Sequence, residues 1–183
     1  MIYASSAATY GLGEHGYKDD HELVSKLSPL NPYGESKNNF DKWVLNQTTT
    51  PPFWAGVKFF NVYGPREYYK ANTSSIVIQL GHQILDGKPP RLFENSHQIY
   101  RDFIYIEDVI QANIKSCSAS QNGTFNVGTG IARSFQDIAD ILQKELKTDF
   151  NIEYFPNPYE GYQVCLLQLQ MQTLKLQIIN LQL

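Results

Sequence analysis

Residues 32–60 read PYGESKNNFDKWVLNQTTTPPFWAGVKFF, and this stretch predicts a helix followed by a strand. The proline at its start suits the first turn of a helix, and apolar residues such as Phe40 and Val44 follow at helical spacing. The segment WAGVKFF at 54–60 is apolar and aromatic, as strands are. Because the opening letters MIY look like the end of an earlier buried strand, the sequence predicts a strand–helix–strand unit.

The same alternation continues along the rest of the chain. Residues 11–31 and 61–73 are polar and punctuated by glycine and proline, so we expect loops there. Further helices are expected at 74–87, 107–116 and 134–146, and further strands at 100–106, 124–128 and 151–155. Ser134 is expected to cap the last of these helices. Strands that alternate with helices predict an α/β fold with a mainly parallel sheet.

The composition favours a folded domain and argues against several classes of function. Apolar residues make up 42% of the 183 residues, enough for a packed core. The net charge of −3 does not indicate nucleic-acid binding, and no basic amphipathic or long apolar stretch indicates a membrane. The two cysteines are far apart and the four histidines lack ligand spacing, so we expect no metal site and a cytoplasmic, reducing location.

Tyr33 and Lys37 form a Y-x-x-x-K motif at the start of the expected helix. Residues four apart share a helix face, and a nearby ammonium favours the phenolate. Such a tyrosine can take a proton from a substrate hydroxyl while hydride leaves the same carbon. Ser5 and Ser6, at the end of the preceding strand, are placed to hydrogen-bond the reacting oxygen. The alternative is a surface pair, because with 12 tyrosines about one such spacing arises by chance.

Four motifs follow one another along the chain: YASSAATYG, NPYGESK, FFNVYGPRE and RDFIYIEDV. Together they resemble the extended short-chain dehydrogenase/reductase superfamily of nucleotide-sugar epimerases and dehydratases, over residues 2–163. Within that superfamily, SSAATYG, NVYGPREYYK and LFENSHQIYRDFIY are most similar to the epimerases that act at carbon 6 of an ADP-activated heptose.

This resemblance implies a fold, an activity and a cofactor. The implied fold is the C-terminal part of a Rossmann-type parallel sheet with a small substrate-binding lobe, divided as 1–60, 61–163 and a tail at 164–183. The implied activity inverts carbon 6 of ADP-heptose by transient oxidation and reduction with bound NADP, or with NAD, for the lipopolysaccharide inner core. Inversion needs an acid/base group on each face of the transient ketone. The full-length protein is expected to be a homo-oligomer.

The resemblance also assigns roles to residues of this chain. Tyr33 and Lys70 match the two acid/base groups. Ser6 matches the serine beside the reacting oxygen, and Lys37 matches the lysine that holds the cofactor ribose and tunes the tyrosine. The positions that line the cofactor are Tyr33, Lys37, Val62 and Lys70. The positions that surround the ADP-sugar are Ser6, Asn61, Asn72, Gln79, Phe93, Glu94, Asn95, Ser96, Arg101 and Tyr162.

Each of these roles has a plainer structural alternative. Lys70 can be a solvated loop lysine, because a lysine acts as a base only where desolvation or a cationic neighbour lowers its pKa. Ser6 can be a serine that caps a turn, and Phe93 can be a core aromatic. The planar guanidinium of Arg101 suits a diphosphate, but it can also form a salt bridge at a strand edge.

The sequence departs from the family pattern in three places. Tyr68 stands where relatives usually carry glycine. The glycines of GLGEHG at 11–16 have the spacing G-x-G-x-x-G but follow a loop, so they are not the dinucleotide fingerprint, and we expect a fragment that lacks the first βαβ units and does not bind NADP usefully alone. Residues 164–183 alternate leucine and glutamine, and we expect a foreign, frame-shifted tail that adds no function and lowers solubility.

Three rival interpretations remain open at this point. The first is a nucleotide-sugar 4-epimerase. The second is a 4,6-dehydratase, although SSAATYG lacks the acidic residue with which a dehydratase would expel water. The third is an inactive fragment that binds a nucleotide sugar weakly or not at all.

Overall fold

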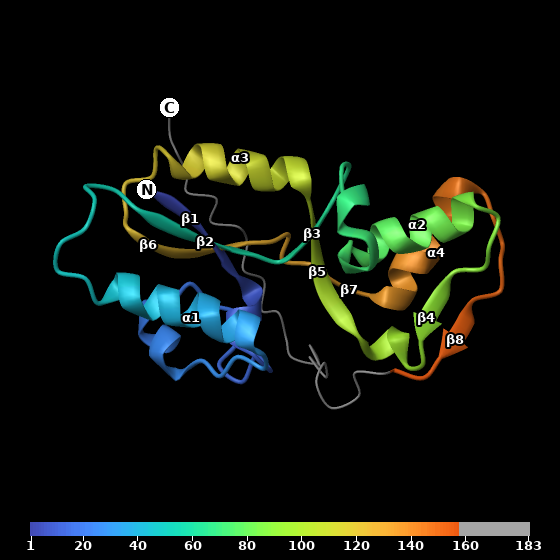
Figure 1. Cartoon of the computed structure of the whole chain (residues 1–183), viewed down its shortest axis with the longest axis horizontal. Helices are drawn as coiled ribbons and strands as arrows, with labels where there is room; N and C mark the ends of the chain where they lie inside the picture. Colours follow the sequence, from blue (N-terminus) through green and yellow to red (C-terminus); the bar gives the residue numbers. More distant parts are fainter. Residues whose placement is uncertain (158–183) are drawn as a thin grey trace.

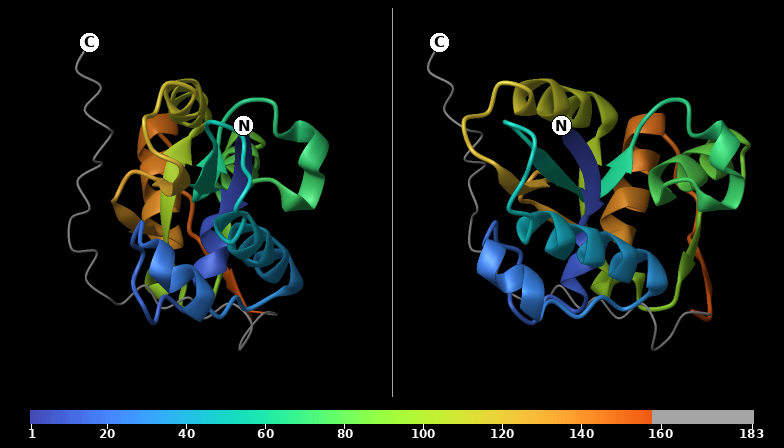
Figure 2. Two further views of the ribbon diagram at one scale, coloured as in Figure 1. Left: turned by 90° about the vertical axis from the view of Figure 1, so that its left-hand side faces the viewer. Right: turned by 60° about the vertical axis from the view of Figure 1, so that its left-hand side comes forward.

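A three-stranded parallel sheet forms one half of the molecule. The computed structural model describes residues 1–157, so Tyr162 and the tail at 164–183 lie outside the described residues. The strands are β1 (Ile2–Ser6), β2 (Ala55–Phe59) and β6 (Gly123–Val127), in the order β1-β2-β6. Helices α1 (Pro32–Leu45) and α3 (Ile106–Ser116) lie on opposite faces of this sheet (Figures 1 and 2). The predicted α/β fold with a mainly parallel sheet is confirmed.

Helix α1 is closed at its start by a side-chain cap and packed tightly along one face. Asn31 accepts a hydrogen bond from the backbone of Gly34 at 2.8 Å, and Pro32 follows in the first turn. A side chain at Gly34 would come within 2.7 Å of the Ala8 carbonyl oxygen, so only glycine permits this approach. Ala8 belongs to the 3-10 helix η1 (Ala7–Tyr10), which continues from β1. The start of α1 is thereby held against the end of β1.

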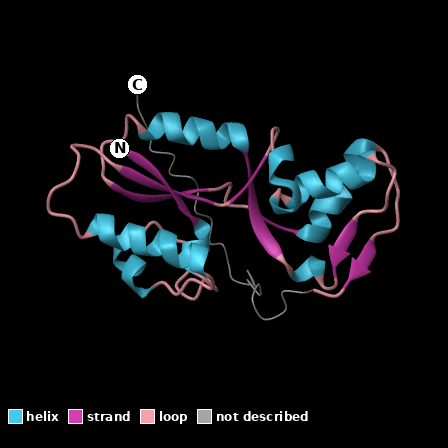
Figure 3. Ribbon diagram, in the orientation of Figure 1, coloured by secondary structure: helices cyan, strands magenta, loops and turns pink. Residues whose placement is uncertain are grey.

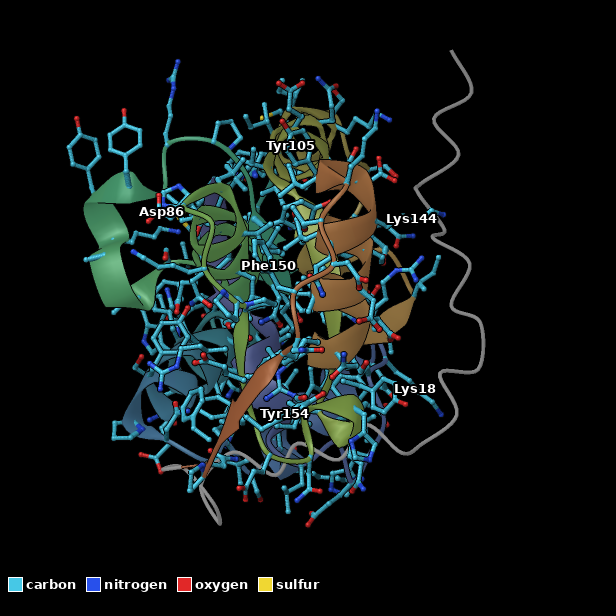
Figure 4. The ribbon with its side chains drawn as sticks, turned by 90° about the vertical axis from the view of Figure 1, so that its right-hand side faces the viewer. Lys18, Asp86, Tyr105, Lys144, Phe150 and Tyr154 are labelled. Atoms are coloured by element: carbon cyan, nitrogen blue, oxygen red, sulfur yellow. The ribbon has the colours of Figure 1, made fainter. Side chains whose placement is uncertain are left out.

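A second group of elements lies beside the sheet. Strands β3 (Asn61–Tyr63), β5 (Tyr100–Tyr105) and β7 (Ala132–Ser134) form a sheet in the order β3-β5-β7, with β7 antiparallel. Helices α2 (Ile76–Leu85) and α4 (Phe135–Leu146) pack together, and β4 (Arg91–Phe93) pairs with β8 (Glu153–Phe155) at the far end (Figure 3). Tyr154, on β8 in Figure 4, donates a hydrogen bond to Gln136 of α4 at 2.7 Å.

Strand β5 joins the two halves of the molecule. Its Ile104 belongs to a buried cluster with Val57 and Val127 of the first sheet. The preceding residue, Phe103, belongs to a second buried cluster that includes Leu80 of α2. Because successive side chains of a strand point to opposite faces, one strand contributes to both cores. Within residues 1–157 no helix is long and apolar enough to cross a membrane.

The expected elements are largely confirmed, with two corrections. Ser134 caps α4 as expected, through a capping box with Asp137. The expectation of a loop at 61–73 is wrong, because β3 pairs in parallel with β5 and the 3-10 helix η3 (Tyr68–Thr73) follows. The loop expected at 11–31 contains the 3-10 helix η2 (His21–Lys26). Strands of three residues such as β3, β4 and β7 are too short to show a sequence period.

Candidate active site

The carboxyl ends of the parallel strands meet at one edge of the sheet. Ser6 pairs with Phe59, and Phe59 pairs with Val127, so β1, β2 and β6 reach this edge at the same level. Asn61 and Val62 follow just beyond β2, on the neighbouring strand β3. Open α/β sheets bind ligands outside the carboxyl ends of their strands, so this edge is the candidate site.

Tyr33 and Lys37 lie at this edge because α1 starts there. The Tyr33 side chain is 56% exposed and therefore accessible to a ligand. The Lys37 ammonium donates a hydrogen bond to the Ala4 carbonyl oxygen of β1 at 2.9 Å and lies 5.7 Å from the centre of the Tyr33 ring. The structure therefore brings the tyrosine and lysine of the motif together, with the lysine fixed to the strand that ends in Ser6.

Ser6 caps a turn, which is the structural alternative considered for it. Its hydroxyl oxygen accepts a hydrogen bond from the backbone of Ala8 at 3.1 Å and caps η1, and its carbonyl oxygen accepts one from Thr9 at 2.9 Å. A hydroxyl that accepts at its oxygen can still donate its own proton. Ser6 is therefore both a turn cap and a possible donor to an oxygen placed at this edge.

A buried ion pair lies beneath the motif, and the sequence analysis missed it. Asp41, two turns after Tyr33 on α1, is fully buried and lies 2.6 Å from the ammonium of Lys58 on β2. The Asp41 carboxylate also accepts hydrogen bonds from Tyr3 at 2.9 Å and from Ser5 at 2.7 Å, both on β1. One carboxylate therefore ties α1 to two strands.

The charges of this ion pair are held in a dry environment. Burial lowers the pKa of Lys58, although the neighbouring Asp41 carboxylate acts in the opposite direction. Burial and the same carboxylate raise the pKa of Tyr3, so its phenol remains a hydrogen-bond donor. The Lys58 ammonium also donates to Thr9 of η1 at 2.8 Å. A lysine inside the expected strand WAGVKFF was the signal for this pair, because a lysine is almost never fully buried without a partner.

Lys70, the other residue assigned to acid/base chemistry, lies in η3 after β3. Its side chain is 55% exposed, and its ammonium lies 3.6 Å from the Glu67 carboxylate. Glu67 itself is only 6% exposed and accepts hydrogen bonds from Gly64 at 3.1 Å and from both the backbone and hydroxyl of Ser75, each at 2.8 Å. Lys70 is therefore paired with an anion and half exposed, so a role as a base would require a bound substrate to exclude water from it. The sequence did not identify Glu67.

Glu67 is held in its ionised form by these partners. Burial alone would raise the pKa of Glu67, but hydrogen bonds from Ser75 and Gly64 and the charge of Lys70 outweigh burial and lower it. A carboxyl whose pKa is lower in the folded than in the unfolded chain stabilises the fold at neutral pH. That contribution is lost as the pH falls through the folded-state pKa.

We expect acidification to show this shift directly. In NMR spectra, the amide proton signals of Gly64 and Ser75 should move together as Glu67 takes up a proton. The midpoint should lie below that of the same carboxyl in an unstructured peptide of residues 64–75, because the folded-state pKa is lowered. The variant Glu67→Gln should lack the transition. A midpoint at or above that of the peptide would contradict the assigned pKa direction.

The residues expected around the ADP-sugar fall into two further groups. Gln79 of α2 donates to the Ser74 carbonyl oxygen at 2.7 Å, so it lies against the end of η3, in which Asn72 also falls. Phe93 packs on Phe155 with ring centres 4.9 Å apart, which agrees with its alternative as a packed aromatic. Glu94, Asn95 and Ser96 follow Phe93 directly, in the connection that leads to β5.

Ser96 and Arg101 follow Phe93 along the chain, and each carries a polar side chain. The Ser96 hydroxyl is fully buried and has no hydrogen-bond partner among the described residues. Arg101 donates to the Tyr100 carbonyl oxygen at 2.7 Å, and its guanidinium lies 5.9 Å from the centre of the Phe135 ring. The next residue, Asp102, accepts hydrogen bonds from Thr129 and Gly130 and so fixes β5 beside the loop after β6.

Many proteins of known structure or sequence are similar to this chain, and three of them are described here. An ADP-L-glycero-D-manno-heptose-6-epimerase from Fusobacterium nucleatum subsp. nucleatum is 41% identical over 161 residues, covering 83% of this chain and 48% of that protein. The crystal structure of the Helicobacter pylori enzyme of the same name is 44% identical with a TM-score of 0.73, over 85% of this chain and 48% of that one. The structure of a UDP-N-acetylglucosamine 4-epimerase from Methanobrevibacter ruminantium M1 is 26% identical with a TM-score of 0.76, over 86% of this chain and 50% of that one.

These similar proteins are all epimerases, and this chain matches a similar share of each of them. The chain spans about half the length of the relatives that it matches. A family model described as the NAD dependent epimerase/dehydratase family matches residues 1–128, which include β1, the Tyr33–Lys37 motif, β2 and β6. The chain therefore belongs to the NAD dependent epimerase/dehydratase family.

Proposed function

We propose that the protein, at the length of its relatives, epimerises ADP-D-glycero-D-manno-heptose to ADP-L-glycero-D-manno-heptose at carbon 6. The observation that carries this proposal is the arrangement at the carboxyl edge, where Lys37 lies between Ala4 and the Tyr33 ring, above the end of β1. Identities of 41% and 44% to proteins named as this epimerase support the choice of substrate. By the same likeness the protein would work in the cytoplasm as a homo-oligomer and supply heptose for lipopolysaccharide.

The residues at this edge fit a nicotinamide cofactor, which we propose is NADP. Lys37 uses one N–H on Ala4, which leaves N–H groups of its ammonium for a ribose hydroxyl. Val62 on β3 offers a half-buried apolar contact next to this edge. When bound, such a cofactor would supply hydride-transfer chemistry at carbon 6. The work of this chain is to hold the sugar and to move the proton.

The proton movements are divided between two side chains. Tyr33 takes the proton of the carbon 6 hydroxyl, while Ser6 donates a hydrogen bond to the same oxygen. Carbon 6 loses a hydride and its oxygen loses a proton, which leaves a ketone. Lys70, from the η3 segment, returns a proton to the oxygen when the hydride comes back to the opposite face. A pair of groups on opposite faces is what inversion requires, whichever of the two acts first.

The substrate assignment can be tested with a small panel of nucleotide sugars. A form of the protein with the length of its relatives is incubated with NADP and either ADP-D-glycero-D-manno-heptose, UDP-glucose or UDP-N-acetylglucosamine. We expect NMR of the products to show inversion at carbon 6 of the heptose and no change in the two UDP-sugars. Inversion at carbon 4 of a UDP-sugar would favour the 4-epimerase alternative, and loss of water would favour a dehydratase. No turnover of any substrate would refute the proposal.

A further inference from the structure

Glu67 is a buried carboxylate whose neighbours along the chain, residues 66 and 68–70, face solvent. Arg66 and Lys70 are exposed, and Tyr68 and Tyr69 are 62% and 86% exposed. Glu67 between them is 6% exposed. A carboxylate is rarely buried unless other groups satisfy it, so its inward position needs a cause. The cause is a set of donors that come from both ends of this segment.

The Glu67 carboxylate joins the two ends of residues 64–75. One oxygen accepts from the Gly64 backbone, where β3 has just ended, and from the Ser75 hydroxyl. The other oxygen accepts from the Ser75 backbone. Ser75 is also the N-cap of α2, where its hydroxyl accepts from Ile78 at 3.3 Å. A single side chain thus bridges the exit of β3 to the start of α2.

The segment between these ends is bent in an unfavourable way. Arg66 has a φ of 72° and Ala71 a φ of 45°, both in the region that favours glycine. Conformations of this kind persist only where the surrounding structure enforces them. Arg66 and Ala71 flank Glu67 and Lys70, so the contacts of Glu67 stabilise the part of the chain that contains these two unfavourable conformations.

Lys70 is attached to Glu67 in two ways. Its backbone N–H donates to the Glu67 carbonyl oxygen at 2.9 Å, and its ammonium lies 3.6 Å from the carboxylate. An ion pair with one half-exposed partner contributes little energy by itself. Its value here is geometric, because the buried carboxylate fixes the turn from which the Lys70 side chain projects.

We propose that Glu67 is a positioning residue for Lys70: its carboxylate fastens Gly64 to Ser75 and so fixes the segment that presents the lysine to the substrate. The inference rests on the proposed function only for the role of Lys70. The closing of the segment by Glu67 stands on the contacts of this chain and can be tested without any catalytic activity.

The first test is hydrogen exchange of backbone amides in the 183-residue chain, resolved by NMR. In Glu67→Gln we expect the Gly64 and Ser75 amides to exchange roughly 10- to 100-fold faster, because they lose a charged acceptor. The decisive amide is that of Lys70, which is bonded to the Glu67 backbone and not to its carboxylate. Its exchange should also accelerate, by about tenfold, if the carboxylate holds the whole segment. The Val57 amide in the buried strand β2 reports global unfolding and should change least.

Two further variants keep this test decisive. Glu153→Gln removes an exposed carboxylate that lies 3.5 Å from Arg91 and should leave all three amides of the segment unchanged. Glu67→Asp keeps the charge but is one methylene shorter, so its acceleration should be smaller than that of Glu67→Gln. If Glu67→Gln does not fold, the aspartate variant carries the comparison. An unchanged Lys70 amide in a folded variant would overturn the proposal.

The second test measures turnover in a form with the length of the relatives. Glu67→Gln should lower kcat about tenfold and leave KM nearly unchanged, because the lysine is misplaced while the sugar-binding residues remain. A purely structural role would not produce this split between kcat and KM. Wild-type kcat in Glu67→Gln would overturn the positioning role. If the wild-type protein shows no epimerase activity, the proposed function fails, and the exchange experiment still decides whether Glu67 closes the segment.

Discussion

Replacing Asp41 with alanine is expected to destabilise the folded chain by about 3–5 kcal/mol, because it leaves the buried Lys58 ammonium without its counter-charge. Lys58 lies 2.6 Å from the Asp41 carboxylate, and both side chains are almost completely buried. The same substitution removes the acceptor for the hydroxyls of Tyr3 and Ser5 on β1. Urea unfolding followed by far-UV circular dichroism measures the loss as a lower midpoint at an unchanged slope.

Two comparisons separate this pair from ordinary charge effects. Asp86→Ala removes an exposed ion pair with Lys88, at 3.3 Å, and should change the free energy of unfolding by no more than about 1 kcal/mol. The double variant Asp41→Leu/Lys58→Met should be more stable than Asp41→Ala, because no charge is left buried and unpaired. If Asp41→Ala unfolds at the wild-type urea midpoint, the ion pair does not hold α1 to the sheet.

For the Asp41–Lys58 pair, the sequence predicts the two elements that carry the residues but not the contact between them. The helix from Pro32 and the strand around Lys58 were both predicted, because each has a local signal of spacing or composition. The contact between Asp41 of the helix and Lys58 of the strand depends on how these two elements pack together. The lysine in an apolar strand indicated that some anion must lie nearby, but not which one.

The candidate site was predictable to a similar degree. The motif spacing placed Tyr33 and Lys37 on one helix face, and the contact of Lys37 with Ala4 supports that placement. Glu67 could not be identified, because it lies with Gly64 in the segment 61–73 that was expected to be a loop, while its other partner, Ser75, lies in the helix expected at 74–87. Its structure depends on β3, whose partner β5 lies about 40 residues further along the chain, so no local pattern indicates it.

In a form of the protein with the length of its relatives, Tyr33→Phe is expected to lower epimerisation by roughly 10²- to 10⁴-fold, because the phenol that takes the substrate proton is lost. The substitution removes a single oxygen from a side chain that is 56% exposed, so the fold should not change. Lys70→Met should abolish inversion to a similar degree, because the second face then lacks its acid/base group. Binding of the ADP-sugar, measured by calorimetry, should remain close to wild type in both variants.

The two variants should differ in what they can still do. If Tyr33 and Lys70 serve opposite faces, each variant retains the proton acceptor for one epimer, so each should oxidise one epimer in a single partial turnover, and the two should prefer different epimers. The absorbance of reduced nicotinamide after rapid mixing measures this step. Tyr69→Phe is the matched control, because it removes the same oxygen from a side chain that is 86% exposed and should leave turnover unchanged. Full epimerisation by Lys70→Met would remove Lys70 from the reaction and make Tyr33 responsible for both faces. Because one fixed phenol cannot reach both faces of a ketone, the sugar would then have to turn over within the site between the two proton transfers.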